Sequence, residues 1–250
     1  MKKILLYLDR GVDGAAARFT YRSLKMEVDP SVYAIQRVDH TYLVSKEWET
    51  DTTLLVIPGG QDVQYDQLLG GAANRRISAF VKEGGSYFGI CAGGYYGCGA
   101  IEFEKGHPNE ICIDRELAFF PGLAAGPAYG PNLWEPHTRR GVRASAVRWG
   151  NQLAHVYFNG GCSFVDPERH PSVSVLARYA DLPGQPAAIV DCTVGCGRAI
   201  LSGVHLEFSA DLMDATDTYV QPYLPFFIAS EPMRKEWFAT ILQKLLAKRA

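Results

Sequence analysis

The first hundred residues alternate short apolar runs with segments of helical periodicity. Helical spacing covers residues 15–25 and 74–82, and the second segment ends in Glu83-Gly84-Gly85, a stop signal for a helix. Strand-like apolar runs occupy residues 4–8, 32–38, 53–57 and 87–90. Continuous apolar strands separated by helices are buried on both faces, so this pattern predicts a parallel sheet with helices on both sides. Sites in such sheets lie at the carboxyl ends of the strands.

The rest of the chain is less regular. Residues 104–136 are rich in Gly and Pro and predict a long excursion with short strands at 111–113 and 117–120. Further strands are predicted over 142–149, 154–158, 173–179, 187–191 and 199–202. Their hairpin-like spacing indicates an antiparallel extension of the sheet. A last helix is predicted to begin at Glu231-Pro232, with an apolar stripe that packs on the core.

These elements predict an α/β fold, a three-layer α/β/α sandwich. Its sheet is flavodoxin-like and mostly parallel, with the antiparallel extension added. A chain of 250 residues with no internal repeat and no clear linker fits one domain over residues 1–250.

Composition narrows the classes of partner. The net charge of −2 and a pI near 6.3 give no electrostatic reason to expect binding to nucleic acid or to a membrane surface, which would need a basic patch. The N-terminal apolar run stops at Asp9-Arg10, too early for a signal peptide, and no run reaches the roughly 18 residues of a transmembrane helix. We therefore expect a cytoplasmic protein with no membrane partner.

The six cysteines, at positions 91, 98, 112, 162, 192 and 196, are too sparse for a disulfide scaffold. Cys192 and Cys196 have no second pair at zinc spacing, so neither a metal nor another cofactor is expected. Most of these thiols are predicted to be small core residues.

Cys91 has a different context, because a predicted strand leads directly into Gly89-Ile90-Cys91-Ala92-Gly93 and then into a candidate helix. This is the pattern of a nucleophile elbow with cysteine in the serine position. The turn is tight enough that side chains two residues on either side of the nucleophile would collide. The pattern predicts a strained backbone at Cys91 and a sulfur at a helix N-terminus, where a thiolate is favoured.

Two other segments fit the same chemistry. Pro58-Gly59-Gly60 ends the preceding apolar strand and is expected beside the elbow, where glycine amides can approach an oxyanion. His205 and Glu207 follow a strand and a glycine. Side chains at i and i+2 of an extended segment point the same way, so the carboxylate is placed to orient the imidazole. Taken one at a time, each segment is also compatible with an ordinary turn or strand.

Together these motifs resemble the oxyanion loop, elbow and His-x-Glu of class I glutamine amidotransferase-like proteins. The longer segments 58–62, 89–97 and 157–162 resemble the amidotransferase-like domain found at the N-terminus of eukaryotic biotin–protein ligases and as free-standing bacterial proteins. The resemblance covers roughly residues 3–210.

The resemblance implies Cys91 as nucleophile, His205 as general base and Glu207 as its orienting carboxylate. It implies the amides of Gly60 and Ala92 as the oxyanion hole. Gly59, Asp62, Tyr95 and Asn159 are weaker candidates for substrate contact. Two positions depart from the glutamine-hydrolysing pattern: Tyr95 stands where Gln usually holds the substrate, and Leu206 stands where Pro usually separates His from Glu.

The leading hypothesis is a thiol-dependent hydrolase or amidotransferase-like protein acting on an amide or related acyl bond of a small molecule or peptide. A cysteine peptidase on this fold is one alternative, and a non-catalytic binding or regulatory module is another. The sequence leaves open the substrate, a homo-oligomeric state and any synthase or ligase partner. A biotin ligase catalytic domain has no room in this chain.

Overall fold

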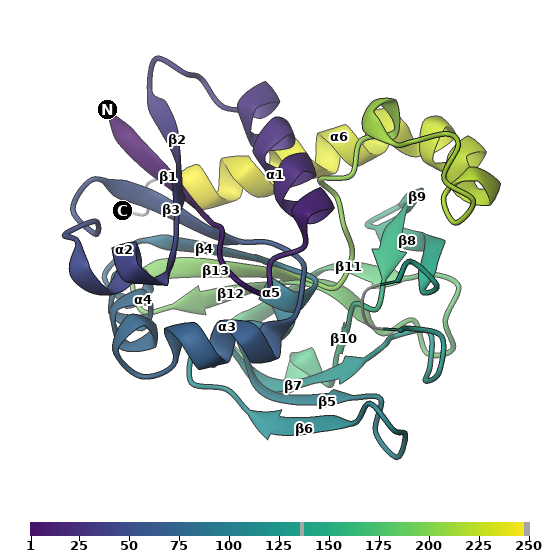
Figure 1. The fold of residues 1–250 in the computed structure, drawn as a ribbon, viewed down its shortest axis with the longest axis horizontal. Helices are drawn as coiled ribbons and strands as arrows, with labels where there is room; N and C mark the ends of the chain where they lie inside the picture. Colours follow the sequence, from purple (N-terminus) through teal and green to yellow (C-terminus); the bar gives the residue numbers. More distant parts are fainter. Residues whose placement is uncertain (136–137, 248–250) are drawn as a thin grey trace.

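The computed structural model describes residues 1–135 and 138–247. Within these residues, thirteen strands form one sheet that lies between helices (Figure 1). The strands are β1 (Lys2–Tyr7), β2 (Tyr33–Val38), β3 (Thr52–Ile57), β4 (Ser86–Ile90), β5 (Cys98–Phe103), β6 (Ile111–Asp114), β7 (Phe120–Gly126), β8 (Val142–Trp149), β9 (Gln152–Asn159), β10 (Ser163–Phe164), β11 (Val173–Tyr179), β12 (Ala187–Val194) and β13 (Gly197–Ser202).

One half of the sheet is parallel, in the order β2-β1-β3-β4-β13. It contains the first four strands of the chain and the last one. Its central strands β3 and β4 are buried almost throughout, as their continuous apolar sequences predict. The order 2-1-3-4 is that of a flavodoxin-like sheet. Because β3 and β4 are neighbours, the loop after β3 and the elbow after β4 meet at one edge of the sheet.

Helices cover both faces of this half. The helices are α1 (Gly14–Glu27), α2 (His40–Ser45), α3 (Asp62–Leu69), α4 (Ala72–Lys82), α5 (Ala92–Tyr96) and α6 (Leu224–Leu246), with 3-10 turns η1 (Pro167–Arg169), η2 (Ala210–Leu212) and η3 (Gln221–Tyr223). One core cluster joins α2, α3 and α4 to the sheet, and another joins α1 and α6 to its other face (Figure 1). The predicted three-layer α/β/α sandwich is confirmed.

The antiparallel extension begins at β13 and continues through β12, β10 and β7, with β11, β8 and β9 branching from β12. The predicted strand at 117–120 is wrong, because β7 runs over Phe120–Gly126. β7 pairs in parallel with β5, a strand that the sequence analysis did not predict. A register irregularity between Cys98 and Ala100 lies opposite this Gly/Pro-containing stretch and allows the strand to continue through Pro121.

The last helix begins earlier than predicted. α6 starts at Leu224 with Pro225 in its first turn, a position that suits proline, and continues through Pro232. Phe227 and Ser230 are buried in the added turns. Ser230 Oγ accepts a hydrogen bond from the His155 amide of β9 at 2.8 Å, so packing on β9 extends the helix beyond the start that Glu231-Pro232 predicts.

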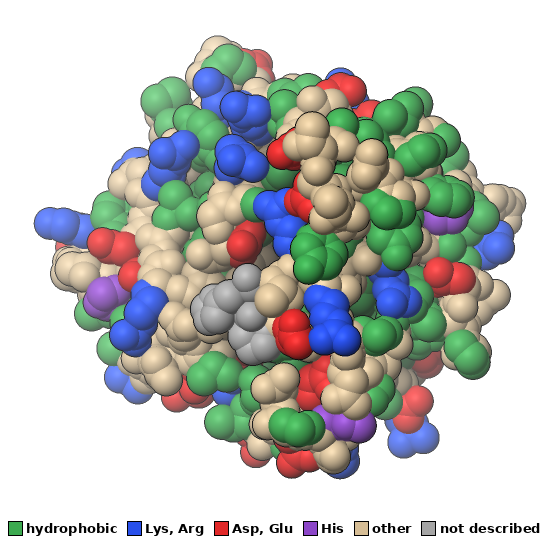
Figure 2. All heavy atoms as spheres, turned by 45° about the vertical axis from the view of Figure 1, so that its right-hand side comes forward, with side chains coloured by type: hydrophobic (Ala, Val, Ile, Leu, Met, Phe, Trp, Pro, Cys, Tyr) green, Lys and Arg blue, Asp and Glu red, His purple; other side chains and the backbone are tan. Residues whose placement is uncertain are grey.

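On the face in Figure 2, basic and acidic side chains are interspersed with apolar ones. Within residues 1–135 and 138–247, no helix combines the length and apolar character that crossing a bilayer requires.

Candidate active site

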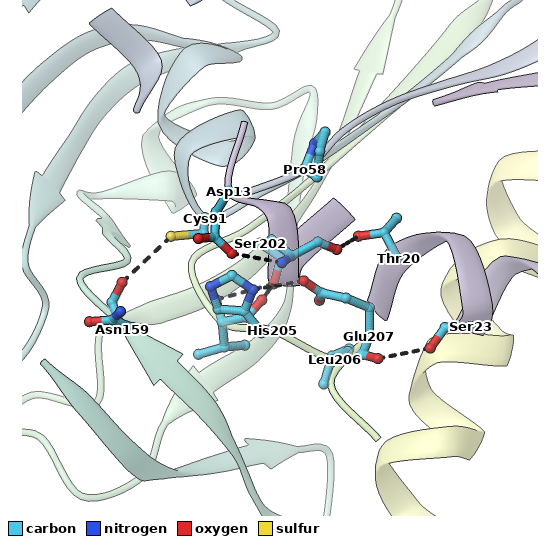
Figure 3. Close-up of polar contacts among 12 residues, drawn as sticks. Asp13, Thr20, Ser23, Pro58, Cys91, Asn159, Ser202, His205, Leu206 and Glu207 are labelled. Atoms are coloured by element: carbon cyan, nitrogen blue, oxygen red, sulfur yellow. Dashed lines mark hydrogen bonds and ion pairs between the residues drawn. The ribbon is translucent and has the colours of Figure 1, made fainter. Parts of the chain in front are cut away.

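Cys91 lies on the sharp turn between β4 and α5. Its backbone has φ 52° and ψ −108°, a conformation that non-glycine residues rarely adopt. The Cys91 amide donates to the Ser202 carbonyl of β13 at 2.7 Å, which fixes the turn to the neighbouring strand. The thiol lies 3.8 Å from the Asn159 carbonyl, and Figure 3 shows the sulfur directed toward that oxygen.

The two glycines of the elbow are required by close backbone contacts. A Cβ at Gly89 would lie 2.2 Å from the Gly93 carbonyl oxygen, and one at Gly93 would lie 2.0 Å from the Ile57 carbonyl oxygen. Neither contact is with a flexible side chain, so neither can relax cheaply. The collision argument drawn from the Gly-x-Cys-x-Gly spacing therefore applies to this chain.

His205 and Glu207 form a buried pair beside the elbow. His205 Nδ1 lies 2.7 Å from Glu207 Oε1, and the two residues are 4% and 0% exposed. The ring turns its other nitrogen to the side on which Cys91 lies (Figure 3). A Cβ at Gly59 would lie 2.8 Å from His205 Cε1 and 3.5 Å from Cys91 Cβ, so imidazole and thiol flank the same glycine.

The backbone brings His205 and Glu207 together in a way that differs from the prediction. Both residues follow the end of β13; His205 forms an isolated bridge with Tyr157, and Leu206 and Glu207 lie in a turn. The alternation of an extended strand is therefore not the cause. Neighbouring elements hold the turn instead: Ser23 of α1 donates to the Glu207 carbonyl at 2.8 Å, and buried Arg234 of α6 donates to the Leu206 carbonyl.

The environment of His205 is aromatic and charged. The rings of Tyr157 and Phe208 lie edge-on to the imidazole, with centroids at 5.4 and 4.9 Å. Burial alone would lower the pKa of His205, but the charges of Glu207 and Cys91, with hydrogen bonds to both, raise this pKa to about 10. The imidazolium is thus the favoured form at neutral pH. Such a cation stabilises a neighbouring thiolate.

The loop after β3 lies beside the elbow, because β3 and β4 are neighbouring strands. Gly60 has φ 156° and forms a bridge with Val12 that uses the amides of Asp13 and Gln61, leaving the Gly60 amide outside it. Ala92 is the first residue of α5, so its amide has no carbonyl partner within that helix. The two amides belong to the loop after β3 and to the start of α5.

The weaker substrate candidates have partners of their own. Asp62 Oδ2 lies 2.6 Å from Arg115 Nη2 in an ion pair that fills much of its hydrogen-bonding capacity. Burial raises the pKa of Asp62 although the Arg115 charge opposes it. Tyr95 is buried, and its hydroxyl donates to the Gly160 carbonyl at 3.1 Å. Asn159 Oδ1 is buried and has no hydrogen-bond partner among the described residues.

Two cavities adjoin at Cys91. The larger, about 510 Å³, is lined by His205, Gly59 and Gly60 together with the loop that begins α1. The smaller, about 340 Å³, is lined by Ala92, Asp62 and Tyr95. Cys91, Gly60, Gln61, Trp134 and Asn159 line both.

The sequence analysis missed several cavity residues: Asp13, Trp134, Arg139, Tyr157 and Phe208. One signal for Asp13 was present, because the Gly11–Gly14 turn follows a parallel strand and so lies at the carboxyl edge. Arg139, which is paired with Asp217, comes from a loop whose position no pattern predicts. Among residues 1–135 and 138–247, no group of three or more His, Cys, Asp or Glu side chains is arranged to hold a metal ion.

Comparison with known proteins identifies the family. The family described as "Biotin-protein ligase, N terminal" matches residues 2–249. An uncharacterized protein of Chlamydia muridarum is 38% identical over 252 residues, covering 99% of this chain and 96% of its own. A biotin–protein ligase of Schizosaccharomyces pombe is 38% identical over 214 residues, covering 83% of this chain but only 34% of the ligase.

Among solved structures, PurLQS from Thermotoga maritima has the same fold, with a TM-score of 0.58 at 14% identity over 96% of this chain and 98% of its own. The fold class and the resemblance drawn from the sequence are both confirmed. The match over nearly the whole chain shows that this protein belongs to the biotin-protein ligase N-terminal family.

Proposed function

We propose that this protein is a cysteine-dependent hydrolase that cleaves an amide or related acyl bond. One observation carries the proposal: a buried imidazole, held at 2.7 Å by a fully buried carboxylate, flanks the same glycine as a cysteine on a strained elbow. Strain of this kind persists only where the surroundings hold it, and it is concentrated at functional sites. A module that only binds has no physical need for this arrangement.

In the proposed reaction the Cys91 thiolate attacks the acyl carbon, and the carbonyl π electrons move to its oxygen. The amides of Gly60 and Ala92 donate to this oxyanion. As the intermediate collapses, the C–N bond breaks and the His205 imidazolium gives its proton to the leaving amine, forming a thioester. His205 then takes a proton from water, whose oxygen attacks the thioester. The acid leaves, and the proton returns to the Cys91–His205 pair.

Glu207 holds the imidazole in the orientation and tautomer that this sequence needs. Its carboxylate bonds Nδ1 and leaves Nε2 to exchange protons with sulfur, amine and water. The charge of Glu207 also stabilises the imidazolium that the resting thiolate pairs with.

The substrate is proposed as a small amide or a peptide, with free glutamine as one candidate among them. Tyr95 occupies the position where glutamine-hydrolysing relatives carry Gln, and its hydroxyl is already bonded to Gly160. A cysteine peptidase would use the same chemistry on a longer substrate. Screening small amides against peptides therefore distinguishes a small-molecule amidase from a peptidase.

The test is the pH dependence of chloroacetamide labelling, followed residue by residue by peptide mass spectrometry. Exposed Cys196 serves as the internal reference. Cys91 is only 7% exposed, yet we expect it to label faster than Cys196 at pH 6.5 to 7. The substitution His205→Ala should abolish that difference in rate. If Cys91 labels no faster than Cys196 and His205→Ala changes nothing, the hydrolase proposal is wrong and a binding module is the better account.

A further inference from the structure

The smaller cavity at Cys91 has an aromatic wall. The rings of Tyr95 and Phe103 meet edge-on with centroids 5.8 Å apart, and those of Phe103 and Trp134 meet edge-on at 5.1 Å. Ile111 and Val63 complete the apolar lining. Because consecutive rings stand nearly perpendicular, the wall offers both faces and edges, the arrangement that packs best against another ring.

The charges around this cavity have one sign. Asp62 and Glu110 line it, and no Lys or Arg among the described residues does. Arg115, which pairs with Asp62 at 2.6 Å and with Asp66 at 3.6 Å, has a side chain only 1% exposed and does not line the cavity. A carboxylate in this cavity would therefore meet two acidic groups and no available cation, whereas an uncharged group would not be repelled.

The aromatic wall is continuous with the reacting sulfur. Cys91 and Ala92 line the smaller cavity, so a group bound there lies next to the thiol and next to one proposed oxyanion donor. The volume, about 340 Å³, lies in the range of small-molecule sites, which are mostly apolar with a few polar groups. Tyr95, which stands at the sequence position where the resemblance to glutamine-hydrolysing proteins would place Gln, is itself part of this wall.

We propose that the substrate carries an uncharged, ring-bearing apolar group next to the scissile amide, and that this group binds between Tyr95, Phe103, Ile111 and Trp134. The inference rests on the proposed function and specifies its substrate class. It places the carboxylate of a free amino acid such as glutamine outside this cavity.

The probes for the test are four chloroacetamides that label Cys91. They are 2-chloroacetamide, N-benzyl-2-chloroacetamide, N-(4-carboxybenzyl)-2-chloroacetamide and 2-chloro-2-phenylacetamide, with each rate divided by the rate of the same probe with glutathione. The second and fourth place the ring on the amine side and on the acyl side, so they show which half of the substrate fills the cavity.

Val63→Trp is the test variant, because Val63 is half-buried on α3 and lines only the smaller cavity. Gln67→Trp is the matched control: it places the same residue one turn later on α3, at an exposed position that lines neither cavity. The rate with unsubstituted 2-chloroacetamide shows for each variant that the fold and the thiol are intact.

In the wild type and in Gln67→Trp, we expect at least one neutral ring probe to label Cys91 about tenfold or more faster than 2-chloroacetamide does, after division by the glutathione rates. Burying an aromatic ring contributes enough free energy for a tenfold difference. Val63→Trp should lose this preference and keep the 2-chloroacetamide rate, and the carboxylated probe should show no enhancement. A wild type without ring preference, or an equal rate for the carboxylated ring, would overturn the substrate inference alone. If no probe labels Cys91 faster than Cys196, the hydrolase proposal itself fails.

Discussion

Replacing Glu207 with Gln tests the coupling between the buried carboxylate and the thiol most directly. The substitution keeps the size of the side chain and removes its charge. In the folded protein Glu207 is fully buried, its Oε1 bonds His205, and its Oε2 has no partner among the described residues. The charge of Glu207 is the leading influence that offsets the burial of His205.

The expected magnitude follows from the pKa of His205. With Glu207 present this pKa is raised to about 10. Without that charge only the influence of Cys91 opposes burial, and the pKa should fall toward the ordinary value of about 6.5. A difference of this size corresponds to about 5 kcal/mol in favour of the imidazolium, at 1.36 kcal/mol per pK unit. At pH 7 the imidazole becomes neutral, and we expect Cys91 labelling to slow by about 10- to 100-fold, because a thiol of ordinary pKa, about 8.5, is only a few per cent thiolate at this pH.

The same shift makes a prediction about stability. A histidine whose pKa is higher in the folded than in the unfolded state holds its proton over the intervening pH range. The stability contributed by that proton is complete below pH 6.5 and is lost as the pH rises toward 10. The difference in free energy of unfolding between wild type and Glu207→Gln should therefore shrink over this window, because other titrating groups are common to both.

The assays are the pH–rate profile of chloroacetamide labelling and urea unfolding at pH 6.5, 8 and 10. Glu236→Gln is the matched control, since Glu236 is an exposed carboxylate on α6. The reasoning is refuted if Glu207→Gln labels at the wild-type rate at pH 7 and its stability difference from wild type does not change between pH 6.5 and 10.

Three further substitutions test the support around the site. Gly93→Ala places a methyl group against the Ile57 carbonyl and should cost about 3 kcal/mol or more in urea unfolding, and a loss below 1 kcal/mol would contradict the close contact. Tyr95→Phe leaves the Gly160 carbonyl without its donor and should cost about 1 to 2 kcal/mol, measured the same way; an unchanged midpoint would show the bond to be unimportant. Arg234→Met removes a buried cation that holds the turn before the carboxylate, and it should cost about 3 kcal/mol and slow Cys91 labelling. Labelling at the wild-type rate in folded Arg234→Met would assign this residue to stability alone.

Local patterns predict the elbow well, because its requirements are local. Two glycines around a cysteine after an apolar strand define a turn in which collisions leave little choice, and the observed backbone at Cys91 agrees. Adjacency of β3 and β4 follows from the parallel sheet, so the position of the Gly59-Gly60 loop beside the elbow was also predictable.

Other parts depend on contacts between distant segments. Asp62 looked free to bind substrate, yet its ion pair with Arg115 joins residues 53 positions apart. The pairing of β5 with β7 and the early start of α6 depend on tertiary packing that overrides the Gly and Pro signals. His205 and Glu207 meet as predicted, but a turn held from α1 and α6 brings them together, and no local period encodes that turn.

The residues of the proposed reaction and those of the proposed substrate cavity come largely from different parts of the chain. Cys91 and His205 follow parallel strands, and the segment that carries His205 and Glu207 is held through backbone carbonyls by α1 and α6. The walls of the smaller cavity come largely from α3, the short helix α5 and the strands and loops that follow it up to Trp134. A change in the wall such as Val63→Trp should therefore alter which amide is accepted while the reactivity of the thiol stays the same. A change at Glu207 should instead lower the reactivity of the thiol and leave the preference among amides unchanged.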